Sequence, residues 1–164
     1  MEAGKSRAVP LMMRILFTSP HCILDPASGA AASMRTLLES LAGRGHEVRT
    51  LTGGAMDGPG DPGVFDRLAV QSAGGAEAGV GVGAAAGAGE AFVEGEVRGV
   101  LHRVLRFEST SERAVLASEN ERLFAAWGSL AGGWRPGAVL TFGGFLHNKL
   151  VLAQARRLGA RHRF

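Results

Sequence analysis

The stretch that decides the fold begins with Arg14-Ile15-Leu16-Phe17-Thr18-Ser19 and continues to Thr52. Its first residues are β-branched, aliphatic and aromatic with no polar face, which is typical of a strand buried on both sides. From Ala30 the apolar residues change to helical spacing, at Met34, Leu37, Leu38 and Leu41. Glu47-Val48-Arg49-Thr50-Leu51-Thr52 then begins a second strand. Strand, helix and strand in such close succession predict a βαβ unit with parallel strands and a right-handed crossover.

The ends of this helix carry recognisable capping residues. Ser28 or Ser33 can accept a hydrogen bond from the first-turn N–H groups. Gly45 can adopt the left-handed conformation that commonly follows a helix end.

The same residues resemble the amino-terminal opening of family 4 glycosyltransferases. The resemblance rests on the first strand, the loop ending Ser28-Gly29-Ala30-Ala31 and the turn Gly43-Arg44-Gly45-His46-Glu47-Val48. A second block, from Arg135 through Val139-Leu140 to Gly143-Gly144, resembles a later strand of the same lobe. Family members are retaining enzymes of the two-lobed GT-B architecture. The resemblance therefore implies an α/β fold, a Rossmann-like parallel sheet with flanking helices forming one lobe of that architecture.

Composition sets wider limits on the chain. A length of 164 residues allows one domain with a sizeable core. The net charge is only +3 and the sequence shows no dense basic face, so no nucleic-acid partner is expected. The single Cys22 excludes an internal disulfide and a Cys-based zinc site, and favours a reducing, cytoplasmic compartment. No apolar run approaches the length of a membrane span, and no signal peptide is recognisable.

Several segments after the second strand have the composition of loops. We expect a loop from Gly53 to Pro62 and a mobile Gly/Ala-rich loop over residues 73–90. Residues 64–70 fit either a short helix or a strand. Residues 1–12 are expected to form a flexible extension before the domain, which spans residues 13–164.

The later part of the chain predicts the remaining elements. Residues 96–107 have helical periodicity, but the resemblance implies a strand or hairpin there, which we favour. Ser118-Glu119-Asn120-Glu121 has capping-box form before a helix that should end near Gly132-Gly133. A buried strand over residues 138–142 leads through Gly143-Gly144 to a helix over 146–158, with Gly159 as its cap. Because residues 160–164 indicate a further strand, we expect an incomplete, truncated lobe.

In an open parallel sheet, ligands bind beyond the carboxyl ends of the strands. The loops over residues 19–31, 52–61 and 143–148 lie there, and in the resembling family the first approaches the acceptor and the donor phosphate. The predicted substrate-binding residues are Ser28, Gly29, Ala30, Gly143, Gly144, His147 and Asn148. Two alternatives stay open: Gly29 is needed only for the turn, and His147 with Asn148 forms a solvated first helical turn. Ala30 stands where the family more often has a second glycine.

Other polar residues are predicted to be structural. His21 and Cys22 are adjacent, but no orienting acid is evident, so a Cys–His nucleophile is not favoured. His46 lies at the opposite end of the sheet. Glu119 and Glu121 are expected as a cap and a solvated face, not as an acid/base pair. No metal site and no cofactor are predicted, and the catalytic residues are unknown.

The resemblance implies a glycosyltransferase of hexosyltransferase type in the complete protein. Its partners would be a nucleotide-sugar donor and a sugar or lipid-linked acceptor, with peripheral membrane contact where the acceptor is lipid-linked. The third partner would be a missing carboxyl-terminal lobe, and without that lobe the chain alone should be inactive. The alternative is a non-catalytic Rossmann-like nucleotide-binding or interaction domain. A nicotinamide-dependent dehydrogenase is disfavoured because no Gly-x-Gly-x-x-Gly follows the first strand and no acid ends the second.

Overall fold

The computed structural model describes residues 12–57, 63–66, 68, 92–107, 117–143 and 146–163. These residues form a six-stranded sheet in the order β3-β4-β2-β1-β5-β6. All strand pairs are parallel except β3 with β4, so the predicted α/β class and Rossmann-like parallel sheet are confirmed. The predicted extension over residues 1–12 lies outside the described residues except for Met12, and the predicted loop over 73–90 lies wholly outside them.

Strand β1 (Arg14–His21) lies at the centre of the sheet, between β2 (Glu47–Ala55) and β5 (Ala138–Thr141). Ile15 pairs with Val48 on one side and with Ala138 on the other. Residues 15–20 are all buried, as the apolar run predicted. The predicted adjacency and parallel direction of these three strands are confirmed.

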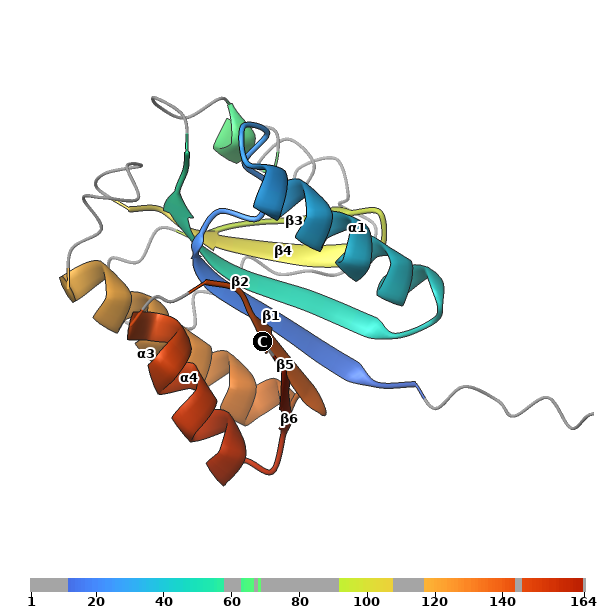
Figure 1. Ribbon diagram of the computed structural model, residues 1–164, viewed down its shortest axis with the longest axis vertical. Coiled ribbons are helices and arrows are strands. Elements are labelled where there is room, and N and C mark those ends of the chain that lie inside the picture. The colour runs from blue at the N-terminus through green and yellow to red at the C-terminus, as the bar shows by residue number, and fades with distance from the viewer. Residues whose placement is uncertain are drawn as a thin grey trace, which may run out of the picture.

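The helices cover both faces of this sheet (Figure 1). Helix α1 (Gly29–Gly43) lies on one face, while α3 (Ala117–Trp134) and α4 (Leu146–Arg157) lie together on the other. Side chains of β1 alternate between the two layers. Ile15 and Phe17 pack in a cluster with Leu38 of α1, whereas Leu16 packs in a cluster with Trp127 and Val151 of α3 and α4. The alternation explains why β1 has no polar face.

Both ends of α1 have the predicted caps. The Ser28 side chain accepts a hydrogen bond from the Ala31 N–H at 3.4 Å, and Gly45 has φ +86°. Leu38 is fully buried, but Leu37, expected on the same face, is 46% exposed. Adjacent helical residues point about 100° apart, so α1 buries a narrower stripe than predicted.

The segment with ambiguous periodicity forms a hairpin, β3 (Phe92–Val97) and β4 (Val100–Leu105). This confirms the strand interpretation. Arg98 and Gly99 connect the strands with φ values of 50° and 76°, the left-handed conformations that a tight two-residue hairpin requires. Strand β4 pairs in parallel with β2, so the hairpin extends the sheet beyond β2.

Two boundaries differ from the sequence-based predictions, and one choice that the sequence left open is decided. A loop was predicted from Gly53, but strand β2 continues through Gly53 and Gly54 to Ala55. Both glycines are buried against neighbouring segments of the protein. Helix α3 already includes Ala117, one residue before the predicted capping box, and Glu119 is a buried residue of its first turn. Residues 64–66 are helical, which decides the open choice between helix and strand in favour of helix for that part.

The carboxyl-terminal elements agree with the pattern. Helix α4 begins where it was expected, Gly159 has φ +71°, and β6 (Arg161–Arg163) extends the sheet beyond β5. No helix in the described part of the chain is long and apolar enough to cross a membrane.

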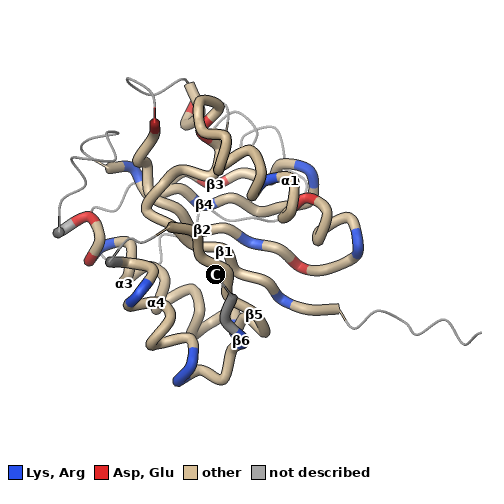
Figure 2. The backbone as a smooth tube through the Cα atoms, viewed as in Figure 1, with Lys and Arg blue, Asp and Glu red and all other residues tan. Residues whose placement is uncertain are grey.

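Figure 2 shows charged residues near the amino-terminal ends of β1 and β2, far from the carboxyl ends of these strands. Glu47 accepts hydrogen bonds from Trp134 Nε1 at 2.8 Å and from Arg49 at 2.9 Å, and pairs with Arg14 at 3.2 Å. Partial burial raises the pKa of Glu47, but these hydrogen bonds and the two arginine charges outweigh it and lower the pKa overall. His46, at the same edge, accepts a hydrogen bond from the Met13 N–H at 3.3 Å, which agrees with its predicted structural role.

Replacing Gly53 with alanine should strongly destabilise the fold. A Cβ there would lie 2.2 Å from the Phe107 ring and 2.5 Å from the Pro20 carbonyl oxygen, which is backbone and cannot rotate away. We expect urea unfolding to show a loss of about 3 kcal/mol or more. Gly43→Ala is the matched control, since a Cβ at Gly43 meets nothing within 4 Å. Equal stability of the two variants would contradict the close packing at Gly53.

Candidate functional site

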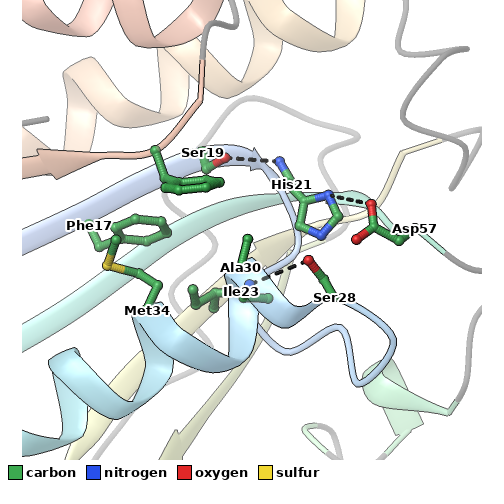
Figure 3. A pocket seen from close by; sticks show the side chains of 10 residues that line it. Phe17, Ser19, His21, Ile23, Ser28, Ala30, Met34 and Asp57 are labelled. Carbon is green, nitrogen blue, oxygen red and sulfur yellow. Dashed lines mark hydrogen bonds and ion pairs between the residues drawn. The ribbon is translucent and has the colours of Figure 1, made fainter.

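A cavity of about 220 Å³ opens at the carboxyl end of β1 (Figure 3). Its walls come from β1, the loop that follows, the first turns of α1, the end of β2 and the residue after β5. The lining residues are Phe17, Ser19, His21, Ile23, Ser28, Ala30, Ala31, Met34, Asp57 and Phe142. We call this cavity the carboxyl-edge pocket.

The topology of the sheet determines this position. From β1 the chain passes through α1 on one face to β2, whereas β5 on the other side of β1 is reached through α3 on the opposite face. Neighbouring connections that leave in opposite directions open a crevice at the carboxyl ends of the strands. The cavity therefore lies where the rule for open parallel sheets predicts that a ligand binds.

The carboxyl-edge pocket has an apolar side and a polar side. Phe17, Ile23 and Met34 supply apolar surface together with Phe142, whose side chain is largely exposed for an aromatic residue. The polar side is formed by Ser19, His21, Ser28 and Asp57. A lining of this kind suits a ligand with apolar C–H surface and several hydroxyl groups.

The start of α1 contributes two of the predicted binding residues to this lining. Ser28 and Ala30 line the pocket, and the first turn of α1 carries no acidic residue. Gly29 is exposed, its φ is not positive, and an added Cβ would meet nothing within 4 Å. The turn itself therefore does not require glycine, so the alternative that Gly29 is needed only for the turn is wrong. The role of Gly29 in binding stays a prediction.

Three of the other predicted binding residues, Gly143, His147 and Asn148, are not among the residues that line the pocket. His147 and Asn148 are fully buried, so the alternative of a solvated first helical turn is wrong. His147 Nε2 and Thr18 Oγ1 share a hydrogen bond of 2.8 Å, and Asn148 Nδ2 donates to the carbonyls of Phe142 and Gly143 at 2.6 and 2.9 Å. These contacts attach the start of α4 to β1 and β5. Gly143 has φ +84° at this turn, and Gly144 lies outside the described residues.

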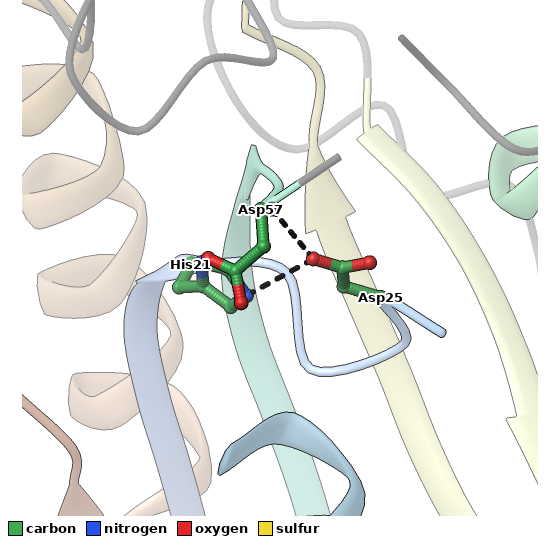
Figure 4. A group of neighbouring side chains, drawn as sticks. All are labelled: His21, Asp25 and Asp57. Atoms are coloured by element: carbon green, nitrogen blue, oxygen red, sulfur yellow. Dashed lines mark hydrogen bonds and ion pairs between the residues drawn. The ribbon is translucent and has the colours of Figure 1, made fainter. Parts of the chain in front are cut away.

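The structure also brings together three side chains that the sequence analysis did not connect. His21 Nε2 lies 3.3 Å from Asp25 Oδ2, and His21 Nδ1 lies 3.9 Å from Asp57 Oδ1 (Figure 4). The expectation that no acid lies near His21 is therefore wrong. Asp25 and Asp57 follow the carboxyl ends of two adjacent parallel strands, and the same edge rule applied to acidic residues could have found them. Cys22 is buried in a separate apolar cluster with Met56 and Phe65.

Asp25 links two loops through backbone hydrogen bonds. Its carboxylate, which is only 1% exposed, accepts from the Ala27 N–H at 2.9 Å and from the Asp57 N–H at 2.7 Å. The loop after β1 is thereby tied to the end of β2. This link holds His21 and Asp57 at the polar side of the pocket.

No family model, no curated protein and no solved structure matches this chain. The geometry of the pocket and the resemblance of the sequence motifs are therefore the two grounds for assigning a function.

Buried histidines should make the fold sensitive to mild acid. Burial disfavours the charged imidazolium and lowers the pKa of both His102 and His147 from 6.5 to about 4. The unfolded chain binds protons below pH 6.5 while the folded chain stays neutral to about pH 4, so stability falls as the pH drops through that window. At pH 5 the loss is about 2 kcal/mol per histidine relative to pH 7.5.

Urea unfolding of the wild type and of His147→Gln at pH 7.5 and pH 5 measures this contribution. The variant should be less stable at pH 7.5 but should lose about 2 kcal/mol less on acidification. An identical pH dependence of the two proteins would show that His147 is not held neutral by burial.

Removing the Asp25 carboxylate should destabilise the loops around the pocket. Asp25→Ala leaves the N–H groups of Ala27 and Asp57 without their acceptor, which we expect to cost roughly 2 kcal/mol or more in the free energy of unfolding. Asp66→Ala removes an exposed carboxylate elsewhere in the chain and should change stability by less than about 0.5 kcal/mol. Equal effects of the two substitutions in thermal unfolding would argue against the link.

Proposed function

We propose that this chain is the acceptor-side lobe of a retaining glycosyltransferase of the two-lobed family 4 type. In the complete enzyme, the carboxyl-edge pocket binds a sugar or lipid-linked acceptor while a nucleotide-sugar donor is held largely by a second lobe. The observation that carries the proposal is the position of the pocket, at the carboxyl end of β1 where the chain reverses its direction of winding.

The spatial arrangement of the resembling segments supports this proposal. The first block contains β1, α1 and the start of β2, and the second block contains β5, which begins more than a hundred residues after the end of β1. In the sheet β5 pairs directly with β1, so both blocks contribute to one edge of the fold. Ser28 and Ala30 of the first block face the same cavity as Phe142 of the second.

The chemistry of the lining favours a hydroxylated acceptor over a nucleotide phosphate. The His21 imidazole, the Asp57 carboxylate and the Ser19 and Ser28 hydroxyls can exchange hydrogen bonds with sugar hydroxyls. The apolar C–H face of a sugar ring can pack on the aromatic surface of Phe142. A diphosphate would instead meet the negative charges of Asp57 and the buried Asp25, which disfavours a nucleotide in this pocket.

The contribution of this lobe to catalysis is positioning. Glycosyl transfer forms a bond between an acceptor hydroxyl oxygen and the anomeric carbon of the donor sugar, while the bond from that carbon to the diphosphate breaks. Holding the hydroxyl in reacting geometry lowers the entropic part of the barrier. Stabilising the charge on the departing diphosphate requires donors elsewhere, which in the resembling family come mostly from the second lobe.

Filling the pocket should weaken acceptor binding. Ala30→Leu places a larger apolar side chain into the cavity, whereas Ala32→Leu makes the same change on α1 at a residue outside the lining. In saturation-transfer NMR with a pool of mono- and disaccharide acceptors, we expect Ala30→Leu to raise the Kd by about tenfold or more and Ala32→Leu to leave it nearly unchanged.

Supplying UDP-, GDP- and ADP-sugars with the same acceptors tests the role of the second lobe. We expect no released nucleotide above the protein-free control. Turnover by this chain alone would contradict the assignment of the donor to another lobe. Absence of acceptor binding, or equal binding by both leucine variants, would contradict an acceptor pocket.

A further inference from the structure

Three side chains that commonly bind metals meet at the polar side of the carboxyl-edge pocket. His21 ends β1, Asp25 lies in the following loop and Asp57 follows β2, and one potential ligand atom from each lies within 4.8 Å of the others. Within the part of the chain that the structure describes, no other group of three such side chains is found. Figure 4 shows the His21 ring beside the Asp57 carboxylate, with a dashed line that joins His21 to Asp25.

We propose that His21, Asp25 and Asp57 bind one divalent metal ion. No metal site was expected from the sequence, in which the single cysteine excludes Cys-based zinc patterns. The ligands proposed here come from two adjacent strand ends rather than from one sequence motif.

The distance between two of the candidate ligand atoms fits a shared ion. His21 Nε2 and Asp25 Oδ2 are 3.3 Å apart. Metal–ligand bonds of about 2.0–2.2 Å at tetrahedral or octahedral angles place neighbouring ligand atoms roughly 3 Å apart. Asp57 is the adjustable ligand, because its side chain is 43% exposed and can rotate without disturbing the core.

The buried ring nitrogen of His21 is an independent indication. Nε2 is shielded from solvent yet has no hydrogen-bond partner, since its contact with Asp25 lacks hydrogen-bond geometry. Leaving a buried nitrogen unsatisfied is unfavourable. A metal ion between Nε2 and the Asp25 carboxylate would satisfy the lone pair of a neutral imidazole.

Asp25 also has the supporting contacts of an oriented metal ligand. Backbone N–H groups of Ala27 and Asp57 donate to its two oxygens at 2.9 and 2.7 Å, which fixes the carboxylate. Second hydrogen bonds of this kind typically orient metal-binding carboxylates. Each carboxylate oxygen keeps a further lone pair for an ion.

The charge balance favours a cation. In the described part of the chain, neither Asp25 nor Asp57 forms an ion pair with lysine or arginine, and His21 is the side chain that pairs with both. The Arg35 guanidinium donates to the backbone carbonyls of Ile23 and Asp25 rather than to a carboxylate. Two carboxylates outnumber the single imidazole beside them, so a divalent ion would offset their negative charge.

The donor set indicates which ions should bind. One imidazole with two carboxylates suits Mn²⁺, Fe²⁺ or Zn²⁺, whereas Ca²⁺ and Mg²⁺ prefer oxygen ligands alone. Three protein ligands leave coordination positions open. Because His21 and Asp57 line the cavity, a hydroxyl oxygen of a ligand in the pocket could complete the coordination. The ion-binding site itself does not rest on the proposed glycosyltransferase function, because binding is measured without donor or acceptor.

Electron paramagnetic resonance with Mn²⁺ as the probe tests the site on the metal-free 164-residue chain. Loss of the free Mn²⁺ signal counts bound ions, and electron spin-echo modulation from ¹⁴N reports coordination by an imidazole. We expect one Mn²⁺ per chain, ¹⁴N modulation, and displacement by Zn²⁺ at lower concentration than by Mg²⁺. Thermal unfolding in the same solutions should show a higher Tm with bound ion.

Matched variants identify the ligands. Asp57→Asn and His21→Gln should each weaken Mn²⁺ binding by about tenfold or more, and His21→Gln should abolish the ¹⁴N modulation. Asp66→Asn, the same change at an exposed carboxylate outside the cluster, should leave binding unchanged. No binding up to about 1 mM, the weak end for protein sites, would overturn the proposal. So would missing ¹⁴N modulation in the wild type, or equal Mn²⁺ affinity of Asp57→Asn and Asp66→Asn.

Discussion

The burial of β1 on both faces is the constraint on which the rest of this structure depends. Ile15 and Phe17 require a helix layer on one side, and Leu16 requires a second layer on the other. The backbone of β1 is paired along both edges, by β2 and by β5, so its polar groups are satisfied inside the core. The carboxyl end of this strand, at His21, is therefore a fixed point from which the following loop starts.

The residues of the candidate site lie around this fixed strand end. Ser19 and His21 extend from β1, Ser28 and Ala30 from the first residues of α1, and Asp57 from the end of β2. Buried polar contacts keep these elements in register: Asp25 joins the loop after β1 to β2, and Thr18 with His147 joins β1 to α4. Some residues that looked like ligand contacts in the sequence thus serve to hold the pocket together.

The two proposals concern the same edge of the sheet but rest on different properties. The acceptor pocket follows from shape and from a lining that is apolar on one side and polar on the other. The metal site follows from atom separations and from an unsatisfied buried nitrogen beside two carboxylates. An ion there would offset the negative charge that disfavours phosphate in the pocket, so it would also widen the range of ligands that the pocket can accept.

The sequence by itself determined the elements whose signals are local. Apolar runs predicted β1 and β5, periodicity and capping residues predicted α1 and α4, and together they predicted the parallel sheet and the edge that bears the cavity. Only the tertiary structure decided the burial of His147 and Asn148, the continuation of β2 through Gly53, and the meeting of His21 with Asp25 and Asp57. The reason is physical: period and capping are set by neighbours along the chain, whereas burial and convergence of side chains are set by packing between segments distant in sequence.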